Sequence, residues 1–152
     1  MGTRLIRLSE EEREEALLIV ETFNDSSIKD RNILMARLGK LISKVDSYNS
    51  LPHDNKIIEY QYDILQSILE QASELRSSGK LLELGKKIKC PVITIHSDYD
   101  PHPFEGVRDS LSSILKDFKF ILLEKCGHYP WTERNAKDRF YSILKNAAKK
   151  SS

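Results

Sequence analysis

The fold is decided by the stretch Pro91-Val92-Ile93-Thr94-Ile95-His96 and its counterpart Phe118-Lys119-Phe120-Ile121-Leu122-Leu123-Glu124. Both runs are rich in β-branched and aromatic residues, which favour extended strands. Between them, and again after the second run, apolar residues recur at the spacing of a helix face. These two stripes comprise Phe104, Val107, Leu111, Ile114 and Leu115, then Ala136, Phe140, Ile143 and Ala147. The order strand, helix, strand, helix predicts an α/β fold with a parallel sheet covered by helices.

Residues 1–87 read as a helical region, with helix patterns from Ser9 onward and a turn-rich break from Asp46 to Pro52. Ser9 followed by Glu12 forms a capping box, which predicts a helix start, and Leu17, Val20 and Phe23 continue its apolar face. Further helices are expected along the stripes Ile33 to Val45, Ile58 to Ala72 and Leu81 to Leu84, with Asn24 to Ser27 ending the first helix. The chain therefore divides near residue 88 into a helical region, residues 1–87, and an α/β region, residues 88–152.

Composition excludes several classes of protein. The 152 residues include 24 Lys+Arg and 23 Asp+Glu, a net charge of +1, so we expect no nucleic-acid partner and no membrane partner. No apolar run reaches the roughly 20 residues of a membrane helix, and the first residues lack a secretory signal, so we expect a cytoplasmic protein. Cys90 and Cys126 are too few and too far apart for a disulfide framework or a zinc site, and both are expected to be reduced.

The two loops that follow the predicted strands are rich in chemically reactive side chains. The first loop is His96-Ser97-Asp98-Tyr99-Asp100-Pro101-His102-Pro103, and the second is Cys126-Gly127-His128-Tyr129-Pro130-Trp131. In an open parallel sheet both loops leave the carboxyl ends of neighbouring strands, which is where ligands bind. We therefore expect an aspartate of the first loop to meet the histidine of the second.

These loops resemble the last two strand–helix units of the α/β-hydrolase family. In that family a Gly-x-x-Asp turn supplies the acid of the catalytic triad, and a Gly-His pair after the last strand supplies the base. Asp100 matches the acid and Gly127-His128 matches the base, 128 − 100 = 28 positions later, although Ser97 stands where the family usually has glycine. The segment 88–152 thus resembles the C-terminal portion of the hydrolase sheet, and residues 1–87 resemble, more loosely, the helical cap or lid.

The resemblance implies hydrolysis of an ester, thioester or amide of a small molecule, with no cofactor. His128 would take the proton of a serine hydroxyl, and Asp100 would fix the tautomer of the imidazole. The nucleophile elbow Gly-x-Ser-x-Gly is missing, because none of the six glycines stands in that pattern. Since the family's chain order is nucleophile, acid, base, the serine would precede Met1. We expect the C-terminal portion of a hydrolase, separated by truncation, gene splitting or an internal start, with little turnover alone.

Two parallel strands form an incomplete sheet, since three or more strands or good helix cover are normally needed. Neither predicted strand carries the charges or internal proline that guard an edge. We therefore expect a homo-oligomer, for example a dimer, or a complex with a complementing N-terminal hydrolase piece. The alternative to a catalytic role is a non-catalytic interaction protein that associates through the same strand edges.

The loops also allow other site assignments. Asp98 is the rival acid, and we favour Asp100 because of its position in the turn before Pro101. The alternation of His96, Asp98, Asp100 and His102 suggests a metal site of imidazole and carboxylate ligands. Pro101 interrupts the strand, however, so all four cannot share one face, and we expect no metal site from this pattern.

For three further residues of the second loop, the sequence allows two roles each. Tyr129 and Trp131 either shape the mouth of a pocket or cover the last helix. Cys126 is next to the base, but no neighbouring residue in the sequence is expected to lower its pKa. We therefore expect a buried structural thiol.

Overall fold

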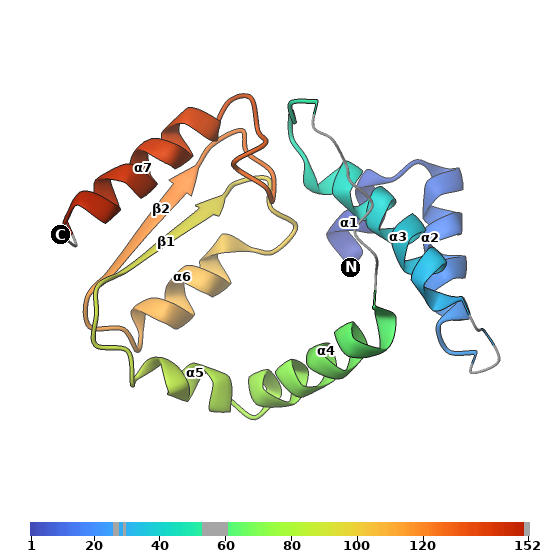
Figure 1. Cartoon of the computed structure of the whole chain (residues 1–152), viewed down its shortest axis with the longest axis horizontal. Helices are drawn as coiled ribbons and strands as arrows, with labels where there is room; N and C mark the ends of the chain where they lie inside the picture. The colour runs from blue at the N-terminus through green and yellow to red at the C-terminus, as the bar shows by residue number, and fades with distance from the viewer. Residues whose placement is uncertain (26–27, 29, 53–60, 151–152) are drawn as a thin grey trace. The chain divides into compact units, whose positions relative to one another are not determined.

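The computed structural model describes residues 1–25, 28, 30–52 and 61–150. Within these residues the protein is a mixed α/β structure of seven helices and one two-stranded parallel sheet (Figure 1). The helices are α1 (Gly2–Arg7), α2 (Glu10–Thr22), α3 (Arg31–Asp46), α4 (Tyr62–Ser77), α5 (Lys80–Gly85), α6 (Phe104–Ser112) and α7 (Lys137–Lys150); the strands are β1 (Val92–Ser97) and β2 (Phe118–Leu123). The strands lie within one residue of the predicted ones at each end.

Residue contacts divide the chain into two compact units. One comprises Met1–Val45 and Asp54–Glu74, and the other comprises Asp46–His53 and Leu75–Ser152. The second unit contains the sheet, and it also contains residues 75–87, which the sequence pattern groups with the helical region. None of the described helices has both the length and the apolar character needed to cross a membrane.

In the first unit, helix α2 begins with the predicted capping box. The Glu12 amide donates to Ser9 Oγ at 3.3 Å, and the Ser9 amide donates to Glu12 Oε2 at 3.2 Å. These two bonds satisfy amide groups that have no partner within the helix. The short helix α1 in front of Ser9 was not expected from the sequence pattern.

The buried face of α2 differs from the predicted one. Ala16 and Ile19 are buried, whereas Leu17 and Val20 are exposed. Phe23, the third predicted residue, does pack against the core, which consists of Leu8, Ala16, Ile19, Leu38 and Val45. The buried positions of α2 therefore lie about one residue around the helix from the predicted stripe. Of the residues named for helix patterns, Ser26, Ser27 and Ile58 lie outside the described residues.

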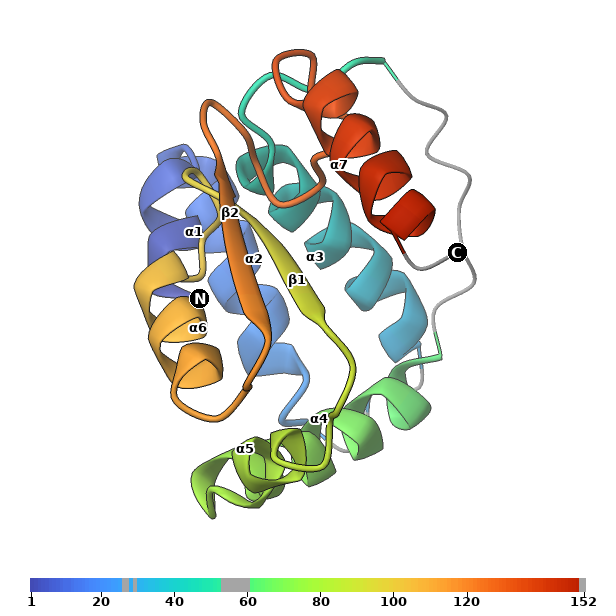
Figure 2. The same cartoon turned by 90° about the vertical axis from the view of Figure 1, so that its left-hand side faces the viewer.

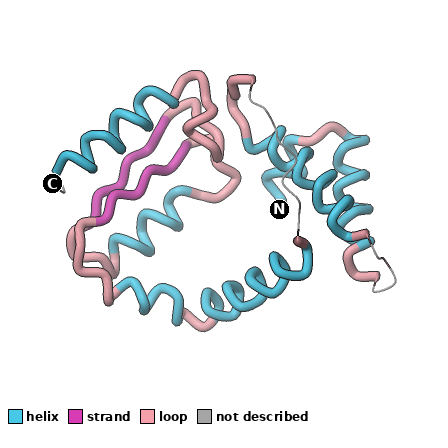
Figure 3. Tube along the Cα trace, viewed as in Figure 1, coloured by secondary structure: helices cyan, strands magenta, loops and turns pink. Residues whose placement is uncertain are grey.

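In the second unit, β1 and β2 pair in parallel from Val92 opposite Phe118 to Ser97 opposite Leu123. Figures 1 and 2 show α6 and α7 on opposite faces of this sheet. Its buried core consists of Leu123, Cys126 and Ala136, with Ile95, Phe140 and Ile143 packed against it. Because the strands are parallel, both end at the same edge of the sheet, where their following loops meet (Figure 3).

Candidate active site

Asp98 joins the two loops at the carboxyl ends of the strands. Its amide donates to the carbonyl of Leu123 at 3.0 Å, so the strand pairing extends one residue beyond β1. Its carboxylate accepts the amides of Lys125 at 2.9 Å and Cys126 at 3.1 Å. Lys125 has a φ of 53°, in the left-handed region. Both carboxylate oxygens of Asp98 therefore bind backbone groups.

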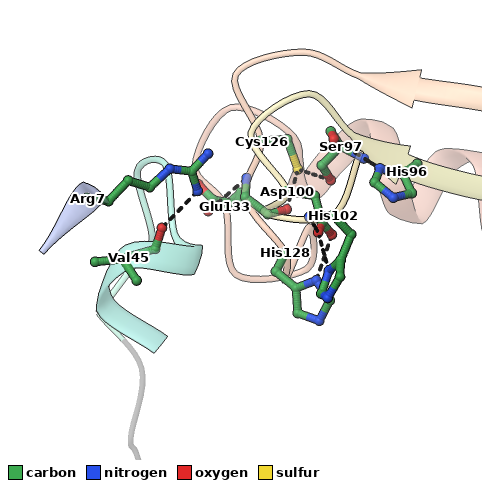
Figure 4. A network of polar contacts seen from close by, with 10 residues as sticks. Arg7, Val45, His96, Ser97, Asp100, His102, Cys126, His128 and Glu133 are labelled. Atoms are coloured by element: carbon green, nitrogen blue, oxygen red, sulfur yellow. Dashed lines mark hydrogen bonds and ion pairs between the residues drawn. The ribbon is translucent and has the colours of Figure 1, made fainter. Parts of the chain in front are cut away.

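Asp100, two residues further along, contacts the histidine of the second loop. His128 Nδ1 lies 2.6 Å from Asp100 Oδ2 (Figure 4). The meeting of an aspartate and a histidine expected at this edge is therefore present, and the partner of His128 is Asp100 rather than Asp98. The short distance is typical of a hydrogen bond with a charged partner.

A second imidazole contacts the other oxygen of Asp100. His102 Nδ1 lies 2.8 Å from Asp100 Oδ1, and the backbone amide of His102 donates to the same oxygen at 2.8 Å. The side chain of Asp100 is only 9% exposed, whereas those of His128 and His102 are 36% and 57% exposed. One shielded carboxylate thus holds two imidazoles that remain accessible to solvent.

The hydrogen bonds decide the charge of Asp100. Burial alone would raise its pKa, but the amide of His102 and the side chains of His128 and His102 together outweigh burial, so the pKa lies below the ordinary value. Asp100 is therefore ionised at neutral pH and can only accept hydrogen bonds. It follows that His128 donates from Nδ1, which leaves Nε2 of the neutral ring as the proton acceptor.

Glu133, which no pattern in the sequence indicates, fixes the backbone next to His128. It is completely buried, and its carboxylate accepts the amides of Tyr48 at 2.8 Å, Asn49 at 2.7 Å and Gly127 at 3.2 Å. The amide of His128 itself donates to the carbonyl of Asp46 at 2.7 Å. The loop after α3 is therefore part of the support of the second loop.

Gly127 is required by close packing at this point. A Cβ atom at this position would lie 2.5 Å from Glu133 Oε1 and 2.8 Å from Ser47 Cα, and it would also overlap the carbonyl oxygen of Asp46. Two of these three neighbours are backbone atoms, which cannot rotate away. Any residue larger than glycine would therefore clash at position 127, directly before His128.

A pocket of about 350 Å³ opens beside Asp100, His102 and His128. Its apolar wall includes Trp131 and Phe140, whose ring centroids are 5.9 Å apart. Trp131 therefore has both of the roles that were predicted as alternatives: it borders the pocket, and it packs against α7. Tyr129 packs edge-on against the His128 ring at 4.9 Å.

Cys126 is a buried thiol, as expected. Burial raises its pKa, and the carboxylates of Glu133, Asp98 and Asp100 act in the same direction against a hydrogen bond from Ser97. A thiol with a raised pKa is a poor nucleophile at neutral pH. Cys126 therefore contributes packing to the loop.

Three potential metal ligands converge at the same place. One donor atom each of Asp100, His102 and His128 lie within 4.8 Å of one another. Of the four alternating residues considered from the sequence, Asp100 and His102 come together, while Asp98 binds backbone amides and His96 Nδ1 accepts the amide of Ser97. The third ligand comes from the other loop.

No protein-family model matches this chain, and no curated protein or solved structure shows significant similarity to it.

We expect Glu133→Ala to lower the free energy of unfolding by roughly 2–4 kcal/mol, because three backbone amides lose a charged acceptor. Glu133→Gln should cost less, since the amide oxygen can still accept from Tyr48 and Gly127. Urea unfolding measures both effects. Glu124→Ala, which removes an exposed carboxylate of the same unit, is the control, and an equal effect of both alanine variants would contradict the role of Glu133.

The lowered pKa of Asp100 predicts a pH-dependent contribution to stability. This contribution is complete above the unfolded pKa of about 3.9 and is lost as the pH falls through the lower folded pKa. Asp100→Asn should therefore lower the free energy of unfolding by roughly 1–3 kcal/mol at about pH 7 and by less at about pH 3. Urea unfolding at both pH values tests this, with the exposed Asp117→Asn as control. A cost that is the same at both pH values would refute it.

Proposed function

We propose that this chain carries the acid and the base of a serine-hydrolase-type site and acts in acyl transfer to water. The observation that carries this proposal is the 2.6 Å contact between Asp100 Oδ2 and His128 Nδ1. The two residues follow adjacent parallel strands, the placement that the α/β-hydrolase resemblance implies. On this proposal, residues 88–152 correspond to the last two strand–helix units of that fold, and residues 1–87 to its cap.

The proton chemistry of the pair suits this role. An ionised Asp100 fixes His128 in the tautomer with hydrogen on Nδ1 and stabilises the imidazolium that forms when Nε2 accepts a proton. No hydrogen bond to Nε2 is present among the described residues, so this nitrogen can act on a hydroxyl or water in the adjoining pocket.

The pocket supports a small substrate with an apolar part. Its volume of about 350 Å³ lies at the lower end of the range for small-molecule sites, roughly 300–1,000 Å³. Val107, Trp131 and Phe140 contribute apolar wall next to the histidine. We therefore assign an ester, thioester or amide of a short aliphatic or aromatic acyl group.

The serine of this site is proposed to come from polypeptide outside these 152 residues. The sequence contains no Gly-x-Ser-x-Gly, and the amide that follows such a serine would supply part of the oxyanion hole. The loss of one oxyanion donor typically costs about 10²–10³ in rate. The 152-residue chain is therefore expected to react only with activated esters, by direct action of His128.

This expectation is tested by the hydrolysis of p-nitrophenyl acetate. The parent protein is Cys90→Ser, because the exposed Cys90 thiol would itself react with the ester. We expect a slow rate above the buffer background that His128→Gln abolishes. Asp100→Asn should lower it severalfold, because the imidazole loses its fixed tautomer.

His96→Gln is the control for the loss of an imidazole, since the His96 ring also borders the pocket but does not contact Asp100 in the described structure. It should lower the rate far less than His128→Gln does. A parent rate no faster than that of His128→Gln would contradict the proposal.

Self-association is the second candidate function, and the sheet itself favours it. Within the described residues, β1 and β2 pair only with each other, so each strand keeps one open edge. Exposed apolar side chains of the same unit include Leu81, Leu84, Ile88 and Ile93. We propose that two copies associate through the open edge of β1.

Sedimentation velocity over the micromolar range measures this association. We expect the dimer fraction to rise with concentration and Ile93→Lys to shift the protein toward monomer, because it places a charge on the associating strand. Leu144→Lys on α7, an apolar residue exposed to a similar extent (44% against 40% for Ile93), is the control. A parent protein that stays monomeric throughout would rule the association out.

A further inference from the structure

His102 has no part in the acid–base role proposed above, yet it is held tightly in the same cluster. Its Nδ1 and its backbone amide both bind Asp100 Oδ1, while His128 binds Oδ2. The centroids of the two imidazole rings are 5.6 Å apart. Two imidazoles on opposite oxygens of one carboxylate form a set of ligand types common in metalloproteins.

We propose that Asp100, His102 and His128 bind one divalent transition-metal ion of the zinc class. Neutral imidazole and carboxylate are ligands of Zn²⁺ and Co²⁺, whereas Mg²⁺ and Ca²⁺ prefer sets composed of oxygen alone. The inference goes beyond the proposed hydrolase role, because it needs neither a serine nor an oxyanion hole.

The cluster is close to the size of a metal site. Tetrahedral zinc with bonds of about 2.0–2.1 Å holds its donor atoms roughly 3.3 Å apart. The donor atoms of the three residues already lie within 4.8 Å of one another, and each Nδ1 is within 2.8 Å of an Asp100 oxygen. The remaining adjustment is a rotation of side chains, which the largely exposed ring of His102 permits.

The backbone that carries His102 is restrained. Pro101 and Pro103 flank the residue, and each fixes its own φ and restricts the residue before it. The bond from the His102 amide to Asp100 further fixes the spacing of these two ligands. Less conformational entropy is therefore lost when a metal orders the site.

The surrounding charge favours a cation. Besides Asp100 itself, the carboxylates of Asp98 and Glu133 accept the backbone amides of Cys126 and Gly127, the two residues before His128. All three ligands also border the pocket of about 350 Å³, so a fourth coordination position can be taken by water or a small ligand. A bound ion would engage the same atoms as the proton relay and would inhibit it.

Cobalt binding to the full chain tests the site directly. The Cys90→Ser protein is treated with a chelator and titrated with Co²⁺, whose visible absorption reports coordination by nitrogen and oxygen. We expect one equivalent to bind and Zn²⁺ to displace it, since zinc binds the same ligands more tightly than cobalt. His102→Gln should weaken binding at least tenfold, and the matched variant His96→Gln should leave it unchanged.

Each outcome decides the proposal. Equal Co²⁺ affinity of the His102→Gln and His96→Gln variants, or no saturable binding below millimolar Co²⁺, overturns it. Because His102 is exposed, the His102→Gln protein should fold normally, and urea unfolding verifies this. The titration does not measure hydrolysis, so a negative result leaves the acid–base proposal intact, and the ester assay separately tests that proposal.

Discussion

The geometry of the site depends on the hydrogen bonds that the buried carboxylate of Glu133 accepts. It accepts amides from Tyr48, Asn49 and Gly127, three donors on two segments far apart in the chain. Burying a carboxylate without such partners would be strongly unfavourable, so the three hydrogen bonds are what allow Glu133 to be buried. These hydrogen bonds fix the backbone of the second loop at Gly127, and therefore also the position of His128, the next residue.

Asp98 and Asp100 lie in the same short loop but have different roles, one structural and one in the candidate active site. Both carboxylate oxygens of Asp98 accept backbone amides of the second loop. The carboxylate oxygens of Asp100 instead contact the side chains of His102 and His128. Because Asp98 already holds the two loops together, the carboxylate of Asp100 is left to bind two imidazoles, the exposed His102 and the half-buried His128. The two acids are therefore not interchangeable, although they lie only two residues apart.

The sequence is informative where a local pattern has a regular period. The strand runs predict β1 and β2, and the parallel order then predicts that Asp100 and His128 meet, because neighbouring parallel strands end at one edge. Glu133 could not be found in this way, since all three of its partners are backbone amides and two of them belong to a loop more than eighty positions earlier. The cluster of Asp100, His102 and His128 was missed for a related reason: the alternation in the first loop contains only two of these three residues. Whether the fold extends to a hydrolase with a cap stays a prediction.

The two cysteines differ in a way that has a practical consequence. Cys90 is exposed just before β1, whereas Cys126 is buried at the opposite end of the strands. A thiol-reactive dye would therefore attach at Cys90 alone. The six residues of β1 span about 20 Å at roughly 3.3 Å per residue, which suits energy transfer from Trp131 in the second loop. The native protein thus carries a built-in fluorescent donor and a single labelling position from which movement of that loop can be followed.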